Sequence, residues 1–137
     1  MVSIAASVAW WARTSPAREA LIYEDQRISY VQLQARVTQV AGLLTSRGIQ
    51  PGEVVALLMK NSAAFLELAL AITHVGAVLL PINYRLGAEE VDYILEHAGV
   101  KLLLADAEFA QAAGQRVPVV LVPAEAQRDT RELCAGQ

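Results

Sequence analysis

Residues 51–85 read PGEVVALLMKNSAAFLELALAITHVGAVLLPINYR, and their pattern indicates the class of fold. After the Pro-Gly turn, Val54–Met59 is apolar at every position. A strand with one face in water alternates apolar and polar residues, so this run predicts a strand covered on both faces, as in a parallel sheet. An amphipathic helix follows and stops at Gly76, and residues 78–80 form a second short strand ended by Pro81. A strand, a helix and a second strand in this order are the unit of an α/β fold.

The same alternation continues downstream. The further elements predicted are a helix around residues 91–98 capped by Gly99, a strand at residues 101–105, a short helix from Asp106 and a strand at residues 117–122. Strand and helix thus alternate four times over residues 54–122. This pattern predicts right-handed crossovers and a doubly wound, mostly parallel α/β sheet with flanking helices.

Before the sheet, the sequence predicts helices and a small hairpin. These elements are a helix over residues 4–12, a hairpin of residues 20–23 and 27–29, and a long helix with apolar residues from Leu33 to Leu44. Ser29 and Gln32 have the spacing of a capping box at the start of the long helix, and Gly48 is expected as its left-handed C-cap. Trp10 and Trp11 are adjacent, so only one of the two rings can face the core.

Composition excludes several classes of protein. Hydrophobic residues make up 55% of the 137 residues, and only 18% are charged, against about 25% in an average domain. Intrinsic disorder is therefore excluded, and the chain is long enough to bury a core. The net charge is −3, with no basic stripe, so no nucleic-acid partner is expected. A domain this apolar is expected to be covered by more protein.

The sequence also predicts where the protein works. Cys134 is the single cysteine, which fits a reducing compartment, and no basic residue precedes Arg13, as a secretory signal would require. We therefore expect a cytoplasmic protein. Leu68–Tyr84 carries no formal charge with its histidine neutral, but Gly76 and Pro81 interrupt it, so we expect a helix and a strand rather than a membrane span.

Several stretches, in order and with consistent spacing from about residue 4 to residue 106, match one known pattern. They are Ile28-Ser29-Tyr30, Gly48-Ile49, Pro51–Leu57, Asn61 ahead of Phe65, Glu67 and Ala71, Gly76–Arg85, Glu89–Leu95, and Ala105-Asp106. Each stretch alone is common. Together they resemble the opening of the adenylate-forming (AMP-binding) acyl-CoA synthetase and ligase superfamily.

The resemblance implies a function for a longer parent protein. Such a ligase activates a fatty acid or another carboxylic acid with ATP and Mg²⁺ to an acyl-adenylate, and then transfers the acyl group to CoA. The family's glycine-rich phosphate loop, aromatic-Thr-Glu motif, ribose-binding Asp and catalytic Lys do not occur in residues 1–137. We therefore expect residues 1–137 to be a partial N-terminal domain without a complete second domain, inactive alone, with no catalytic residue and no cofactor of its own.

Two residues are candidate contacts for ligands. The resemblance places Arg85, after the strand that ends in Pro81, near the route of CoA. Asn83 is a candidate substrate contact because it follows the end of the same strand. Both follow a strand, and ligands of doubly wound sheets bind at the carboxyl ends of the strands. The alternatives are a surface ion pair of Arg85 with Glu89 or Glu90, and a structural role for Asn83 in the turn.

The sequence also bears on metal binding, on an alternative function and on association with other chains. Neither His74 nor His97 has a second ligand at metal spacing, so no metal site is expected. A second reading of the chain is a stand-alone interaction module that has kept the start of the fold. For the partial domain we expect self-association, because the sheet of this chain should leave an apolar edge or face uncovered.

Overall fold

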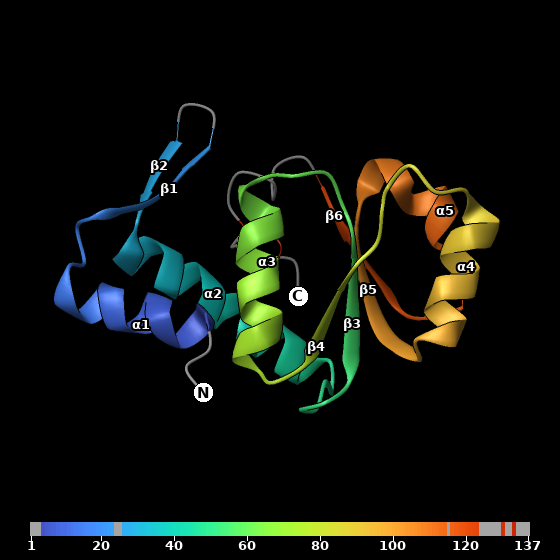
Figure 1. Cartoon of the computed structure of the whole chain (residues 1–137), viewed down its shortest axis with the longest axis horizontal. Coiled ribbons are helices and arrows are strands. Elements are labelled where there is room, and N and C mark those ends of the chain that lie inside the picture. The colour runs from blue at the N-terminus through green and yellow to red at the C-terminus, as the bar shows by residue number, and fades with distance from the viewer. Residues whose placement is uncertain (1–3, 24–25, 115, 124–129, 131–132, 134–137) are drawn as a thin grey trace.

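The computed structural model describes residues 4–23, 26–114, 116–123, 130 and 133 of the chain (Figure 1). The described residues form a four-stranded sheet with helices on both faces, preceded by two helices and a two-stranded hairpin. The α/β fold expected from the sequence is therefore confirmed. Glu24-Asp25 of the expected turn and Cys134 lie outside the described residues.

The N-terminal part contains the predicted helices and hairpin. Its elements are α1 (Ile4–Thr14), β1 (Glu19–Tyr23), β2 (Gln26–Ser29) and α2 (Tyr30–Ser46), with β1 and β2 antiparallel. The ring of Trp11 stacks on that of Tyr30, with 5.8 Å between the ring centroids. Trp10 is 50% exposed. As expected from their adjacency, only one of the two tryptophans packs inward.

The predicted capping box starts α2. Ser29 Oγ accepts a hydrogen bond from the Gln32 backbone N–H at 3.3 Å, and Gln32 Oε1 accepts one from the Ser29 N–H at 3.0 Å. Two backbone donors that the helix cannot satisfy internally are thus paired. The helix ends at Ser46 and is followed by Arg47 and Gly48. Gly48 has a φ of 81°, which confirms the left-handed residue expected after this helix.

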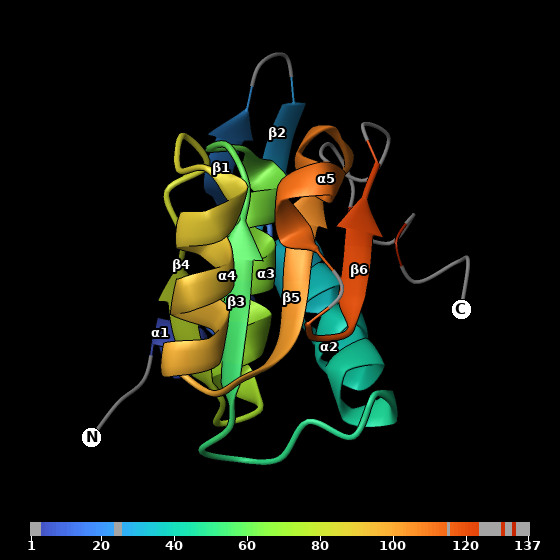
Figure 2. The same ribbon diagram turned by 90° about the vertical axis from the view of Figure 1, so that its right-hand side faces the viewer.

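The sheet is parallel throughout. Its elements, with the connections between strands, are β3 (Val54–Leu58), α3 (Ala63–His74), β4 (Val78–Pro81), α4 (Ala88–His97), β5 (Val100–Asp106), the 3₁₀ turn η1 (Ala107–Phe109), α5 (Ala110–Ala113) and β6 (Val119–Val122). The strand order is β4-β3-β5-β6. In Figure 2 the arrowheads of β3 and β6 point the same way, so the carboxyl ends of the strands meet at one edge.

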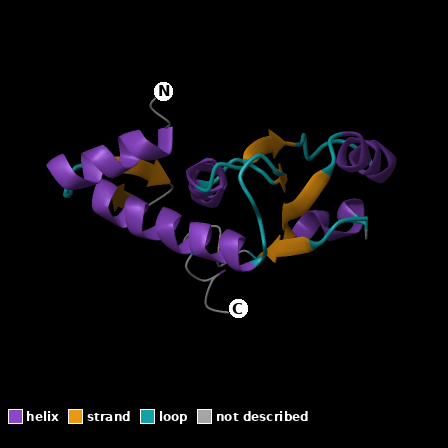
Figure 3. Ribbon diagram, turned by 90° about the horizontal axis from the view of Figure 1, so that it is seen from below, coloured by secondary structure: helices purple, strands orange, loops and turns teal. Residues whose placement is uncertain are grey.

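Strand β3 lies in the middle of the sheet and is covered on both faces, as its unbroken apolar run predicts. Val55 and Leu57 pack into a core with residues of α2 and α3, whereas Ala56 and Leu58 pack into a second core with residues of α4. Figure 3 shows helices on both sides of the strands. Two cores separated by one sheet are the arrangement of a doubly wound fold.

The uncharged stretch Leu68–Tyr84 divides as expected. It contains the end of α3, a turn in which Gly76 has a φ of 79°, and β4. A Cβ at Gly76 would also lie 3.3 Å from the Pro51 Cβ, so this turn favours glycine in two ways. Within the part of the chain that the structure describes, no helix has both the length and the apolarity needed to cross a membrane.

Candidate functional site

The strand order creates a switch point between β3 and β5. The chain goes from β3 to β4 on one side and then returns across β3 to β5 on the other. The helices that follow therefore leave to opposite faces, because α3 packs in the first core and α5 in the second. In open α/β sheets the crevice for ligands lies outside the carboxyl ends of the strands at such a point.

The turn after β4 carries both ligand-contact candidates. Asn83 is exposed, and its Oδ1 accepts a hydrogen bond from the Arg85 N–H at 3.0 Å, while its carbonyl accepts one from the Leu86 N–H at 3.1 Å. These hydrogen bonds of Asn83 stabilise the turn, as Asn often does. The Asn83 side chain therefore holds the backbone of Arg85 in place, so the positions of the two candidates depend on each other.

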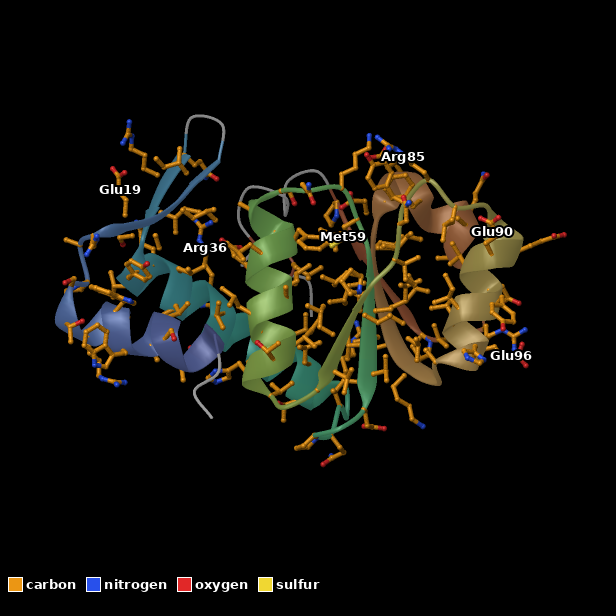
Figure 4. All side chains as sticks on the ribbon, in the orientation of Figure 1. Glu19, Arg36, Met59, Arg85, Glu90 and Glu96 are labelled. Carbon is orange, nitrogen blue, oxygen red and sulfur yellow. The ribbon has the colours of Figure 1, made fainter. Side chains whose placement is uncertain are left out.

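The Arg85 side chain is exposed at the same edge (Figure 4). Its guanidinium carbon lies 5.5 Å from the centre of the Tyr84 ring, within cation–π distance. Among the described residues, Arg85 forms no ion pair with Glu89 or Glu90. The Glu90 carboxylate instead accepts a hydrogen bond from the Gly87 N–H at 3.2 Å, at the start of α4.

The structure brings further residues to this edge that the sequence analysis missed. Lys60 follows β3, and Glu108 and Phe109 follow β5. The rings of Tyr84 and Phe109 stack, with 5.4 Å between centroids and an interplanar angle of 24°. Lys60 Nζ lies 5.9 Å from the Tyr84 ring centre and 6.0 Å from that of Phe109. The position of each residue just after a parallel strand was the signal that could have found it.

A buried carboxylate joins the ends of the two central strands. Asp106, the last residue of β5, is 1% exposed, and its Oδ2 accepts a hydrogen bond from the Lys60 N–H at 2.9 Å. The edge therefore presents two cationic side chains and two stacked rings on a fixed backbone. Such an arrangement can bind an anionic ligand that also has an apolar or aromatic part.

Groups with shifted pKa values lie away from this edge. Burial raises the pKa of Glu67 on α3, while Thr130 and Arg36 beside the carboxylate oppose the shift. On the outer face of α4, the hydrogen bond from Arg116 at 2.7 Å lowers the pKa of Asp92. These two carboxylates belong to ion pairs that connect elements of the fold. We assign them no role at the edge.

Neither the groove beside α1 nor the distribution of potential metal ligands among the described residues indicates a second functional site. A groove of about 380 Å³ runs along α1 and is lined by Ala6, Ser7, Trp10, Trp11 and Arg13. These described lining residues all belong to one helix, which lies far from the carboxyl ends of the sheet strands in Figure 1. Over the described residues, no group of three or more His, Cys, Asp and Glu side chains could hold a metal ion.

Comparison with known proteins identifies the family. The family model for AMP-binding enzymes matches residues 8–135. A feruloyl-CoA synthase from Amycolatopsis is 38% identical over 114 residues, which cover 78% of this chain and 23% of that protein. The solved fatty acyl-CoA synthetase from Mycobacterium tuberculosis superposes with a TM-score of 0.84 at 32% identity, covering 98% of this chain and 28% of that one.

A second similar structure is an o-succinylbenzoate–CoA synthetase from Bacillus subtilis, in complex with ATP and magnesium ion. Its TM-score is 0.80 at 26% identity, and the match covers 93% of this chain and 33% of that one. The chain thus spans a quarter to a third of these solved chains, and less than a quarter of the curated feruloyl-CoA synthase. The comparisons do not support the alternative of a stand-alone interaction module. The family match and the structural match together establish that the chain belongs to the AMP-binding enzymes, a family of acyl-CoA and acid ligases.

Proposed function

We propose that this chain is the N-terminal part of an ATP-dependent acid–thiol ligase. The complete protein would activate a fatty acid or another carboxylic acid as an acyl-adenylate, with release of pyrophosphate, and transfer the acyl group to CoA. The match to the AMP-binding enzymes over residues 8–135 and the CoA-ligase relatives support this reaction. ATP, Mg²⁺ and CoA would be required by the complete protein, which we place in the cytoplasm.

Within that protein, we assign Arg85 to the phosphates of CoA and Asn83 to the substrate side of the same turn. The observation that carries the assignment is the exposed Arg85 guanidinium at the carboxyl edge, without an ion pair to a described carboxylate. An arginine in this state can form bidentate, charge-assisted hydrogen bonds with phosphate. The remainder of the chain acts as a scaffold that holds the turn.

The test separates the two half-reactions in a complete ligase that contains this chain. Arg85→Ala should slow thioester formation about tenfold, the loss expected for one charge-assisted hydrogen bond. ATP–pyrophosphate exchange, which reports adenylate formation, should be unchanged. Arg27→Ala is the matched control, because Arg27 is an exposed arginine on β2 that pairs with Glu19 at 3.0 Å. Equal loss of both half-reactions, or loss of neither, would remove Arg85 from the CoA route.

The chain alone should neither hydrolyse nor exchange ATP, and it should not bind ATP more tightly than about 1 mM. Phosphate loops direct successive backbone N–H groups at the anion, which needs clustered glycines, and residues 1–137 have none. Calorimetric titration of the chain with ATP and Mg²⁺ measures this directly. Binding tighter than about 1 mM would contradict the assignment of ATP binding to other segments of the ligase.

A further inference from the structure

Lys60 lies at the switch point itself. It directly follows the β3 strand and Met59, and α3 begins three residues later, at Ala63. Its ammonium group lies over both stacked rings, Tyr84 and Phe109. Arg85 lies over the same Tyr84 ring. The side chains of Lys60 and Arg85 therefore both lie within about 6 Å of the centre of the Tyr84 ring.

The backbone of Lys60 is fixed, whereas its side chain is exposed to solvent. Asp106 is buried and accepts the Lys60 N–H, which ties the ends of β3 and β5 together. The Lys60 side chain beyond this bond is 53% exposed. Since the tie uses only the backbone of Lys60, replacing its side chain leaves the bond intact.

The present partner of Lys60 is easily displaced. Lys60 Nζ lies 3.3 Å from the Glu108 carboxylate, and the Glu108 side chain is 50% exposed. An ion pair between two half-exposed side chains is weak in water. A phosphate group carries more charge and more acceptor oxygens than a carboxylate, and the nearby N-terminus of α3 also favours an anion.

We propose that Lys60 and Arg85 form a paired cationic site for the phosphate groups of a nucleotide-type ligand, and that Glu108 is the counterion displaced on binding. Lys60 would contact one phosphate and Arg85 another, with the Tyr84–Phe109 stack beside them. The inference extends the function proposed above, in which Arg85 alone contacts CoA. Two ligands of the reaction, CoA and ATP, carry such phosphates, and the experiment distinguishes them.

The chain offers an internal comparison because Lys60 and Lys101 are its two lysines. Lys101 lies near the start of β5, at the amino ends of the strands. Its side chain is 60% exposed, and its ammonium nitrogen lies 3.9 Å from the Glu53 carboxylate. Reductive methylation with ¹³C-formaldehyde labels both ammonium groups and keeps their charge. Methyl NMR spectra then follow the two sites in one sample during titration with CoA, with dephospho-CoA, with Mg·ATP and with inorganic phosphate.

The expected result is a saturable shift of the Lys60 methyl signal with CoA, while the Lys101 signal stays unchanged. A weaker response to dephospho-CoA would assign one of the cations to the 3′-phosphate. A response to Mg·ATP but not to CoA would support a phosphate contact at Lys60 and contradict CoA as the ligand of the pair. Equal shifts of both lysines, or no Lys60 shift with any of these probes, would overturn the proposal.

Substitutions give the second readout, the affinity of the unlabelled chain for the best probe. Lys60→Gln should weaken binding about tenfold, and Lys60→Arg should restore most of it. Glu108→Gln should tighten binding a few-fold, because the ligand no longer has to displace an exposed ion pair from Lys60. If the role of Lys60 were purely structural, Glu108→Gln would not raise the affinity for the probe. Lys101→Gln is the matched control and should leave the affinity unchanged.

The variants also separate this inference from the proposed function. Loss of binding with Arg85→Ala but not with Lys60→Gln would leave the Arg85 contact standing and overturn the paired site. Loss with both variants supports the pair. Loss with Lys60→Gln alone would support Lys60 as the phosphate contact and contradict the role given to Arg85. Circular dichroism of each variant confirms that the helices are intact.

Discussion

Arg36 and Glu67 form a buried ion pair between α2 and α3. Arg36 Nη1 donates to Glu67 Oε1 at 3.0 Å, and the side chains are 7% and 0% exposed (Figure 4 labels Arg36). Two buried charges lose their hydration, so removing one of them takes from the other the opposite charge that offsets this loss. Replacing both by apolar residues of similar volume removes the cost altogether. The pair therefore specifies how the two helices meet more than it adds to stability.

This leads to a prediction about single and double variants. Glu67→Leu alone should lower the free energy of unfolding by about 3–5 kcal/mol, because a charged Arg36 stays buried. Arg36→Met combined with Glu67→Leu should lie within about 1 kcal/mol of the original chain, or above it. Urea unfolding followed by circular dichroism measures both. A double variant as unstable as the single one would show that the ion pair itself holds the helices together.

The same pair should give unfolding a pH dependence. Burial raises the pKa of Glu67 above its ordinary value of 4.5, so the folded chain holds this proton more tightly than the unfolded chain does. The resulting stability is fully present below pH 4.5 and is lost as the pH rises through the raised pKa of the folded state. The double variant lacks the carboxyl group, so this part of the pH slope should be missing from its unfolding curves.

At the scale of single elements, helix caps can be tested most directly. Ser29→Ala removes the hydroxyl that accepts the Gln32 N–H at the start of α2. It should lower the free energy of unfolding by about 1 kcal/mol, the usual cost of an N-cap. Gln39→Ala, at an exposed position within the same helix, is the control and should have little effect. An equal loss in both variants would contradict a specific contribution of the cap.

The helices and strands could be predicted because local patterns determine them. The apolar run of β3, the capping box of α2 and the glycine after each long helix act within a few residues. Boundaries were less certain: the strand expected from residue 117 begins at Val119, after Pro118, which has no N–H to donate to the ladder. A helix or strand was therefore predicted best where the residues that determine it all lie in one short segment.

The contacts at the carboxyl edge could not be predicted in the same way. Lys60, Tyr84 and Phe109 follow three different strands, and their meeting depends on the strand order. The sequence favoured parallel strands but left their order open. Arg85 and Asn83 could be proposed from the sequence because both lie in one motif after β4. The ion pair of Arg36 with Glu67 joins residues 31 positions apart, and neither residue shows its partner in the local pattern.

For the whole molecule, the outer strands of the sheet matter most. Among the described residues, β4 and β6 are the two edges of the sheet. Each edge carries an exposed apolar side chain, with Val78 on β4 49% exposed and Leu121 on β6 46% exposed. Unpaired backbone groups beside apolar side chains are a template for pairing with another chain. The similar solved chains are about three times longer, so they have further segments with which to cover such edges.

We therefore expect the chain alone to self-associate, or to form a swapped dimer, and to bind a hydrophobic dye more strongly than an ordinary small domain does. Light scattering over a dilution series from about 100 μM should show a mass that falls on dilution. Val78→Lys should shift this equilibrium towards the monomer, because a charge on an edge strand opposes pairing. Gln39→Lys adds the same charge at an exposed position of α2 and should leave the association unchanged. A monomer at about 100 μM without a dye signal would mean that the chain closes its own core, since mass action favours any association at that concentration.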